Sequence, residues 1–235
     1  MTSTEHLSKQ FDIDLETLRS RVLQMGGLVE SQILSAIEGL STGNLQLIEQ
    51  VIADDHRVNG CEVSIDTECS HIIVRRQPAA GDLRTIMAIS KTVTDLERIG
   101  DEAEKIARMA KHVHERDRLQ IPRLADINHA GDIAVAMLRK VLDAFARLDA
   151  AEAATVIRDD LAIDEEFRSI VRQLITFMME DPRTISTALE IVWIAKAIER
   201  IGDHAKNMAE QVIYMVKGTD VRHTAFEQVE REVLS

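Results

Sequence analysis

Apolar residues recur along the chain at spacings of three and four, the pattern of helices with one buried face. The pattern is interrupted by prolines at 78, 122 and 182, by the turn sequence Ser-Thr-Gly-Asn at 41–44, and by Arg-Leu-Asp-Ala near 149. Proline cannot continue a helix interior, and short polar stretches favour turns. The sequence therefore predicts six helices, at about residues 8–41, 45–75, 83–114, 124–148, 151–179 and 184–216.

The second half of the chain repeats the first. The sequence Glu-Arg-Ile-Gly-Asp begins at Glu97 and again at Glu199, and the helix-breaking prolines recur at a similar interval. Repetition at one period indicates a tandem duplication of a structural unit. We therefore expect an all-α fold of two tandem, pseudo-symmetric three-helix bundles. The expected units are residues 1–118 and 119–235, the second ending in a polar tail that we expect to be frayed.

The Glu-Arg-Ile-Gly-Asp motif is locally unfavourable in a helix. Two carboxylates one turn apart repel each other by roughly 0.2–0.5 kcal/mol, and a mid-helix glycine is about 1 kcal/mol worse than alanine. Gly100 and Gly202 fall inside apolar stripes, where a missing side chain lets a neighbouring helix approach closely. The motif carboxylates flank these stripes, so we expect them to lie near a seam between helices.

The helix before each motif carries acidic residues within its own apolar stripe. Asp55 interrupts the second predicted helix, and Asp160 interrupts the fifth. If these helices are antiparallel neighbours of the motif helices, four oxygen-bearing side chains converge in each repeat. The converging residues are Asp55, Asn59, Glu97 and Asp101 in the first repeat, and Asp160, Asp164, Glu199 and Asp203 in the second.

Three interpretations of these acidic sets are open. Buried carboxylates are costly unless they are paired, protonated or bound to metal, and oxygen-only ligand sets on facing helices suit magnesium, calcium, manganese or iron. Alternatively, Arg98 and Arg200 neutralise the motifs in a structural salt-bridge network, or the acids form an exposed charged face. At equal geometry the second set, with four carboxylates, should bind a cation more tightly than the first, in which Asn59 supplies an uncharged amide.

The net charge and the lengths of the apolar runs limit which functions the chain can have. The formal net charge of −12 argues against binding to nucleic acid or to an anionic membrane surface. The amino-terminal segment is polar, unlike a signal peptide, and we find no apolar run of the roughly 18–20 residues that span a bilayer. The chain is therefore most simply cytoplasmic.

Motifs for catalysis are sparse. The sequence contains a lone Glu-x-x-His from Glu68 to His71, whereas a ferritin-like di-iron centre needs two, and it contains no His-Glu-x-x-His, P-loop or Gly-x-Ser-x-Gly. We therefore do not expect an enzyme. Two other classes stay open, a carboxylate-bridged metal enzyme and a histidine-phosphotransfer bundle with His204 as the acceptor.

The doubled motif, together with Arg-Arg-Gln-Pro-Ala-Ala-Gly-Asp-Leu-Arg at 75–84 and Asp-Leu-Glu-Arg-Ile-Gly-Asp-Glu-Ala-Glu-Lys-Ile-Ala at 95–107, resembles the PhoU family over residues 10–216. The resemblance implies two tandem three-helix bundles, often dimeric, whose acidic motifs bind multinuclear iron or zinc clusters. By position the ligands would be the two sets given above. Asn59 departs from the acidic pattern, and Glu62, one further turn along, could compensate.

The resemblance also implies a function. PhoU proteins are accessory regulators of bacterial phosphate-specific transport. They link the ATPase of the phosphate ABC transporter to a sensor histidine kinase, and they hold the phosphate-starvation (Pho) response off when phosphate is plentiful. We therefore expect a negative regulator that acts by docking, as a homodimer in the cytoplasm, peripheral to the inner membrane through protein partners.

Overall fold

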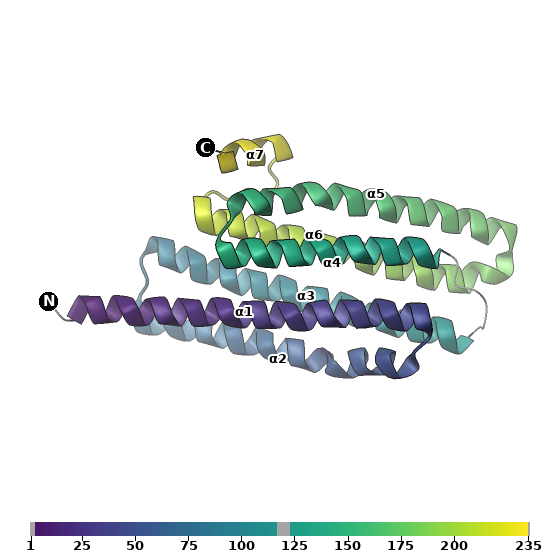
Figure 1. Cartoon of the computed structure of the whole chain (residues 1–235), viewed down its shortest axis with the longest axis horizontal. Coiled ribbons are helices and arrows are strands. Elements are labelled where there is room, and N and C mark those ends of the chain that lie inside the picture. The colour runs from purple at the N-terminus through teal and green to yellow at the C-terminus, as the bar shows by residue number, and fades with distance from the viewer. Residues whose placement is uncertain (1–2, 117–122, 235) are drawn as a thin grey trace.

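The computed structural model describes residues 3–116 and 123–234. Within these ranges the chain forms seven α-helices and one short 3₁₀ turn, without a β-strand (Figure 1). The predicted all-α class is confirmed, and the predicted boundary at residues 118 and 119 lies outside the described ranges. The elements are α1 (Ser3–Thr42), α2 (Leu45–Arg76), α3 (Ala80–Arg116), α4 (Leu124–Arg147), α5 (Ala150–Glu180), the 3₁₀ turn η1 (Pro182–Thr184), α6 (Ile185–Lys217) and α7 (Phe226–Leu234).

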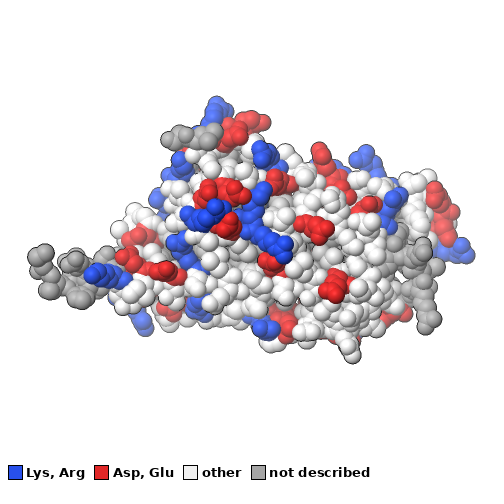
Figure 2. Space-filling view, in the orientation of Figure 1, with Lys and Arg blue, Asp and Glu red and all other residues white. Residues whose placement is uncertain are grey.

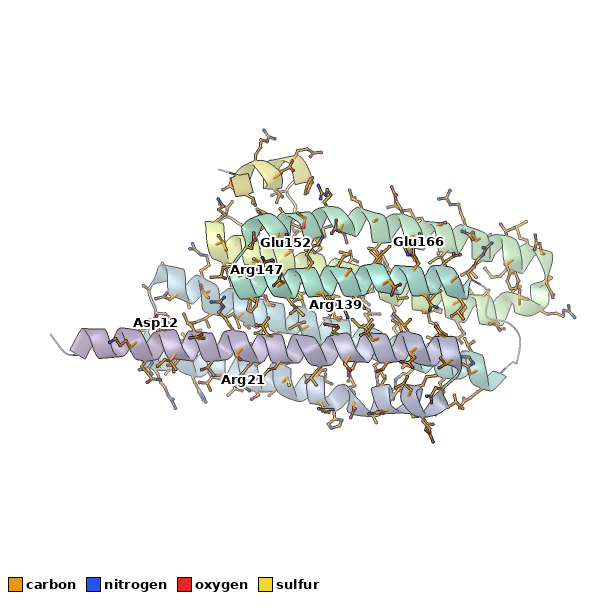
Figure 3. The ribbon with its side chains drawn as sticks, viewed as in Figure 1. Asp12, Arg21, Arg139, Arg147, Glu152 and Glu166 are labelled. Atoms are coloured by element: carbon orange, nitrogen blue, oxygen red, sulfur yellow. The ribbon has the colours of Figure 1, made fainter. Side chains whose placement is uncertain are left out.

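The helices form two three-helix bundles that lie side by side (Figure 1). Helices α1, α2 and α3 pack on one another, and so do α4, α5 and α6. The bundles meet mainly through α3 and α6, and also through α1 and α4. Arg139 of α4, labelled in Figure 3, pairs with Glu30 of α1 at a closest N–O distance of 2.6 Å. The predicted pair of tandem, pseudo-symmetric bundles is therefore confirmed, with α3 and α6 at its centre.

Short-range signals set the ends of several helices. Asn44 caps α2 by accepting a hydrogen bond from the backbone N–H of Leu47, and Asp149 caps α5 by accepting one from Glu152. Such caps satisfy N–H groups that the first turn of a helix leaves unpaired. At the other end, α6 is followed by Gly218 at φ +78°, the left-handed conformation that glycine adopts without a steric penalty.

The two motif glycines lie where neighbouring helices approach each other closely. A Cβ atom added at Gly202 of α6 would lie 2.8 Å from Ile163 Cγ2 of α5, and one added at Gly100 of α3 would lie 3.1 Å from Val58 Cγ1 of α2. The glycines thus let each motif helix pack directly on the helix before it in the same bundle. This packing is what brings the acidic residues of α2 and α5 to the motifs.

The close contact at Gly202 predicts that Gly202→Ala destabilises the protein. Forcing a methyl group against Ile163 should cost about 1–3 kcal/mol, which exceeds the gain of about 1 kcal/mol in helix propensity. The matched control is Gly60→Ala in α2, where an added Cβ meets no described atom within 4 Å, so this variant should gain stability. Urea denaturation followed by circular dichroism measures both, and a stabilised Gly202→Ala protein would contradict the packing argument.

The carboxyl-terminal tail differs from the prediction. We expected it to be frayed, but α7 packs against α5, and Val221 and Val229 are buried. Thr219 also donates a hydrogen bond of 2.8 Å to Glu232. The prediction was wrong because the tail is polar on average, while its few apolar residues lie on one face and reach the second bundle.

Charged side chains of both signs are interspersed over the face shown in Figure 2. Although acidic residues outnumber basic ones in the chain, they do not form one continuous acidic patch on this face. No described helix is long and apolar enough to cross a membrane. Because this face has no continuous charged patch, the acids that are buried or half-buried between the helices are better candidates for a functional site than the surface charges.

Candidate functional site

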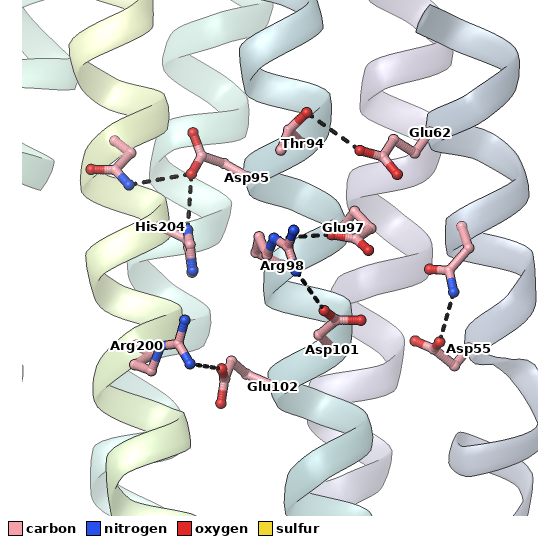
Figure 4. Close-up of polar contacts among 12 residues, drawn as sticks. Asp55, Glu62, Thr94, Asp95, Glu97, Arg98, Asp101, Glu102, Arg200 and His204 are labelled. Atoms are coloured by element: carbon pink, nitrogen blue, oxygen red, sulfur yellow. Dashed lines mark hydrogen bonds and ion pairs between the residues drawn. The ribbon is translucent and has the colours of Figure 1, made fainter.

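The first acidic cluster lies between α2 and α3. Glu97 and Asp101 lie one turn apart on α3, and Asp55 faces them from α2 (Figure 4). Asn59 Nδ2 donates a hydrogen bond of 3.0 Å to Asp55 Oδ2. Arg98 pairs with both motif carboxylates, with N–O distances of 3.5 Å to Glu97 and 3.3 Å to Asp101.

Two further glutamates extend this cluster. Glu62 of α2 accepts a hydrogen bond of 3.3 Å from Thr94 Oγ1 of α3 (Figure 4). Glu104 lies one turn beyond Asp101 on α3 and pairs with Arg108. Glu104 was not among the predicted site residues, although its spacing of three from Asp101 is the signal that could have found it. We define the first cluster as Asp55, Asn59, Glu62, Glu97, Asp101 and Glu104.

The carboxylates of the first cluster act on one another. Burial and then the charge of Glu104 raise the pKa of Asp55 above its ordinary value. Burial also raises the pKa of Glu97, and the charges of Asp101 and Glu62 add to that effect. These side chains therefore share one partly desolvated region, in which each additional negative charge disfavours ionisation of the others.

The second acidic cluster lies between α5 and α6, and lysines neutralise part of it. Asp160 of α5 is only 4% exposed, and its Oδ2 lies 2.6 Å from Lys206 Nζ of α6. Glu199 pairs with Lys196, one turn before it on α6. Burial raises the pKa of Glu199, and the hydrogen bond from Lys196 opposes part of this rise.

The remaining members of the second cluster are coupled to these. Burial and then the charge of Asp160 raise the pKa of Asp203, while lysine charges oppose the shift. Asp164 lies 3.3 Å from Arg168 and adds to the repulsion at Asp203. Burial acts to lower the pKa of Lys206, but the hydrogen bond to Asp160 and the charges of Asp160, Asp203 and Glu210 together outweigh burial, so that the pKa is raised. We define the second cluster as Asp160, Asp164, Glu199 and Asp203.

Several oxygen atoms of the two clusters have the chemistry of metal ligands. Asp55 Oδ1, Asn59 Oδ1, Glu97 Oε2 and Asp160 Oδ1 are buried and find no hydrogen-bond partner among the described residues. Such atoms are costly to bury, and a cation would satisfy them. As the side chains stand, however, no three His, Cys, Asp or Glu side chains in the described ranges form a preassembled metal site.

The donor chemistry fits a cation in the first cluster better than in the second. Three of the four buried atoms without a hydrogen bond belong to the first cluster, and one of these, Glu97 Oε2, has only the 3.5 Å ion pair with Arg98. In the second cluster the ammonium groups of Lys196 and Lys206 already neutralise carboxylates. The predicted salt-bridge interpretation therefore holds for part of each cluster, through Arg98 in the first and through lysines in the second.

A separate set of contacts joins the bundles along the seam between α3 and α6. Arg200 Nη1 of α6 lies 2.6 Å from Glu102 Oε1 of α3, and Glu102 is 4% exposed (Figure 4). Arg200 was expected to neutralise its own motif, but it crosses to the other bundle. Sequence reasoning missed this pair because the partners lie in different repeats.

His204 also belongs to this seam. Its Nδ1 lies 2.9 Å from Asp95 Oδ1, and its side chain is 14% exposed (Figure 4). In the second repeat, His204 occupies the position that Glu102 holds in the first, so the seam is not symmetric. A phosphotransfer partner would have to open the seam to reach this imidazole, which disfavours the phosphoacceptor alternative.

A family model described as the PhoU domain matches residues 22–110 and again residues 127–212, one match in each bundle. The chain belongs to the PhoU family. The predicted family resemblance is thereby confirmed, and the two matches coincide with the duplication seen in the sequence.

Individual members of the PhoU family are similar over almost the whole chain. A phosphate-specific transport system accessory protein PhoU homolog of a Burkholderia species is 50% identical, over 98% of each chain. The crystal structure of PhoU from Pseudomonas aeruginosa is 48% identical, with a TM-score of 0.85 over 89% of this chain and 100% of that one. The phosphate transport system regulatory protein PhoU from Streptococcus pneumoniae is 26% identical, with a TM-score of 0.83 over 90% and 99%.

Proposed function

We propose that this protein is an accessory protein of a phosphate transport system and a negative regulator of the phosphate-starvation (Pho) response. The observation that supports this most strongly is the doubled PhoU match, one copy in each bundle, together with relatives that are named for phosphate-specific transport. The protein acts by docking between the ATPase component of the phosphate ABC transporter and a sensor histidine kinase. It does so as a homodimer in the cytoplasm, peripheral to the inner membrane through these partners.

Docking without turnover is a sufficient mechanism for such a regulator. A ligand that binds one conformation of a kinase more tightly than another shifts the population toward that conformation. The helical surface offers a docking area on α6, where Ile185, Leu189 and Trp193 are exposed at intervals of one turn. Beside them, residues of α3 and α6 that include Met109 line a hollow of about 620 Å³. Exposed tryptophans beside a hollow are typical of interface anchors.

The metal clusters implied by the family are part of the proposal. Iron or zinc would be held by carboxylate and amide oxygens of the first cluster, with Asp55, Glu97 and Asp101 as principal ligands; magnesium, manganese or calcium would suit the same oxygens. A bound cation would supply positive charge between α2 and α3, where the carboxylates repel one another. The residues of the first cluster would hold α2 and α3 together through the cation, and the protein would act by binding and not by catalysis.

The experiment that tests the proposed function is deletion and complementation. In phosphate-rich medium a strain lacking this protein should express alkaline phosphatase, because the repressing partner of the kinase is lost. Supplying the full chain on a plasmid should restore repression. Alkaline phosphatase activity in high phosphate is the measurement, and normal repression in the deletion strain would overturn the proposed regulatory role.

A further inference from the structure

The two acidic clusters differ at one position that decides which cation they hold. Counted from the shared motif, Lys206 of the second repeat occupies the place of Glu104 in the first. We propose that the Lys206 ammonium group is the resident cation of the second cluster, so that a divalent metal ion binds tightly at the first cluster alone. The inference rests on the metal binding included in the proposed function.

The contacts of Lys206 support this assignment. Its Nζ lies 2.6 Å from Oδ2 of Asp160, the most deeply buried acid of the second cluster. The other oxygen of Asp160, Oδ1, is buried without a described hydrogen-bond partner, and Lys206 reaches this carboxylate across the seam between α5 and α6. An ammonium group on the same seam supplies the positive charge that a metal ion would otherwise bring.

A second lysine, Lys196, neutralises charge in the same cluster and lies one turn before Glu199 on α6. Lys196 pairs with Glu199, and its charge also reaches Asp203. In the first repeat Thr94 holds the position of Lys196. The hydroxyl of Thr94 carries no charge and donates a hydrogen bond to Glu62, which leaves the negative charge of that carboxylate in place.

The first cluster has more unneutralised charge. It contains five carboxylates, with Arg98 and Arg108 as ion-pair partners. The second contains four, with Lys196, Lys206 and Arg168 as partners. Arg98 is also a more easily displaced partner than Lys206, because its side chain is 53% exposed and its contacts are 3.3 and 3.5 Å long.

These contacts argue for the reverse of the order expected from the sequence. Counting carboxylates alone ranks the second cluster as the tighter site, because Asp164 replaces Asn59. That count omits the two lysines, which lie on the same helix as Glu199 and approach the cluster from its α6 side. The family motif is the same in both repeats, so the proposed asymmetry arises from the residues around the motif.

The test is a calorimetric titration of the full-length, chelator-treated protein with Zn²⁺ alone. We expect one tight class of sites in the unmodified protein, weakened at least tenfold by Glu104→Lys. Lys206→Glu, which gives the second repeat the residue of the first, should add a second tight class. Lys217→Glu makes the same charge change at the exposed end of α6 and should leave binding unchanged. Circular dichroism confirms that each variant is folded.

The outcomes separate this inference from the proposal on which it rests. Two equally tight sites in the unmodified protein would overturn the inference and leave metal binding in the PhoU-type function intact. Loss of the tight site in Asp160→Asn, with retention in Glu97→Gln, would also overturn it. If Zn²⁺ binds to none of the proteins, Lys206→Glu included, both the inference and the proposed metal binding fail. Glu104→Lys provides an independent reading if Lys206→Glu does not fold.

Discussion

Replacing Arg200 by alanine should destabilise the protein by about 3 kcal/mol, a substantial part of the total stability of a typical domain. Glu102, its partner across the seam between the bundles, has a side chain only 6% exposed. Removing the arginine leaves this carboxylate buried with Lys105, at 3.2 Å, as its remaining described ion-pair partner. Because Lys105 offsets part of the loss, the expected effect is at the lower end of the range for breaking a buried ion pair.

The matched control for this prediction is Arg98→Ala. Arg98 occupies the same position in the first motif as Arg200 in the second, but its side chain is 53% exposed. Exposed ion pairs contribute at most about 1 kcal/mol, so this variant should retain nearly all of its stability. Adding Glu102→Gln to Arg200→Ala should recover part of the loss. Urea unfolding curves decide the matter, and equal destabilisation by the two arginine variants would contradict the proposed importance of the seam.

Replacing Trp193 by glutamate should abolish repression of the phosphate-starvation response while leaving the fold intact. Trp193 is 54% exposed on α6, next to exposed Leu189 one turn before it. A charge placed in the proposed docking area, beside Leu189 and Met109, would have to be desolvated on binding, which is costly without a partner. Because the side chain is exposed in the free protein, the change in folding stability should stay within about 0.5 kcal/mol.

Val74→Glu is the control for the tryptophan variant. Val74 is 76% exposed on α2, outside the area formed by α6. The substitution introduces the same charge in place of an exposed apolar residue, so it separates a local docking effect from a general effect of charge. In the complemented deletion strain, Val74→Glu should repress alkaline phosphatase as the unmodified chain does. Full repression by Trp193→Glu would show that this area is not the docking surface.

The sequence predicted the helices and their duplication because those features depend on local signals. Apolar spacing, proline breaks and caps such as Asn44 act over a few residues, and each can be read without knowing which helix lies opposite. The burial of Asp160 was also predictable, since it interrupts an apolar stripe that had to face a neighbour. The packing at Gly202 followed from the same reasoning.

The partners of the charged residues could not be predicted in the same way. Helical periodicity shows which face of a helix is buried, but it does not show which long side chain from another element reaches it. Arg200 therefore pairs with Glu102 of the other bundle, and Lys206 pairs with Asp160. Such pairings depend on the relative placement of helices far apart in the chain and on rotamers of flexible side chains.

The central claim, regulation by docking, is tested most directly by measuring binding between purified components. The full chain would be titrated with the ATPase component of the phosphate transporter and, separately, with the cytoplasmic portion of the sensor kinase. We expect the unmodified chain and Val74→Glu to bind with equal affinity, and Trp193→Glu to bind at least tenfold more weakly. Failure of the unmodified chain to bind either component, or equal binding by Trp193→Glu, would contradict the account.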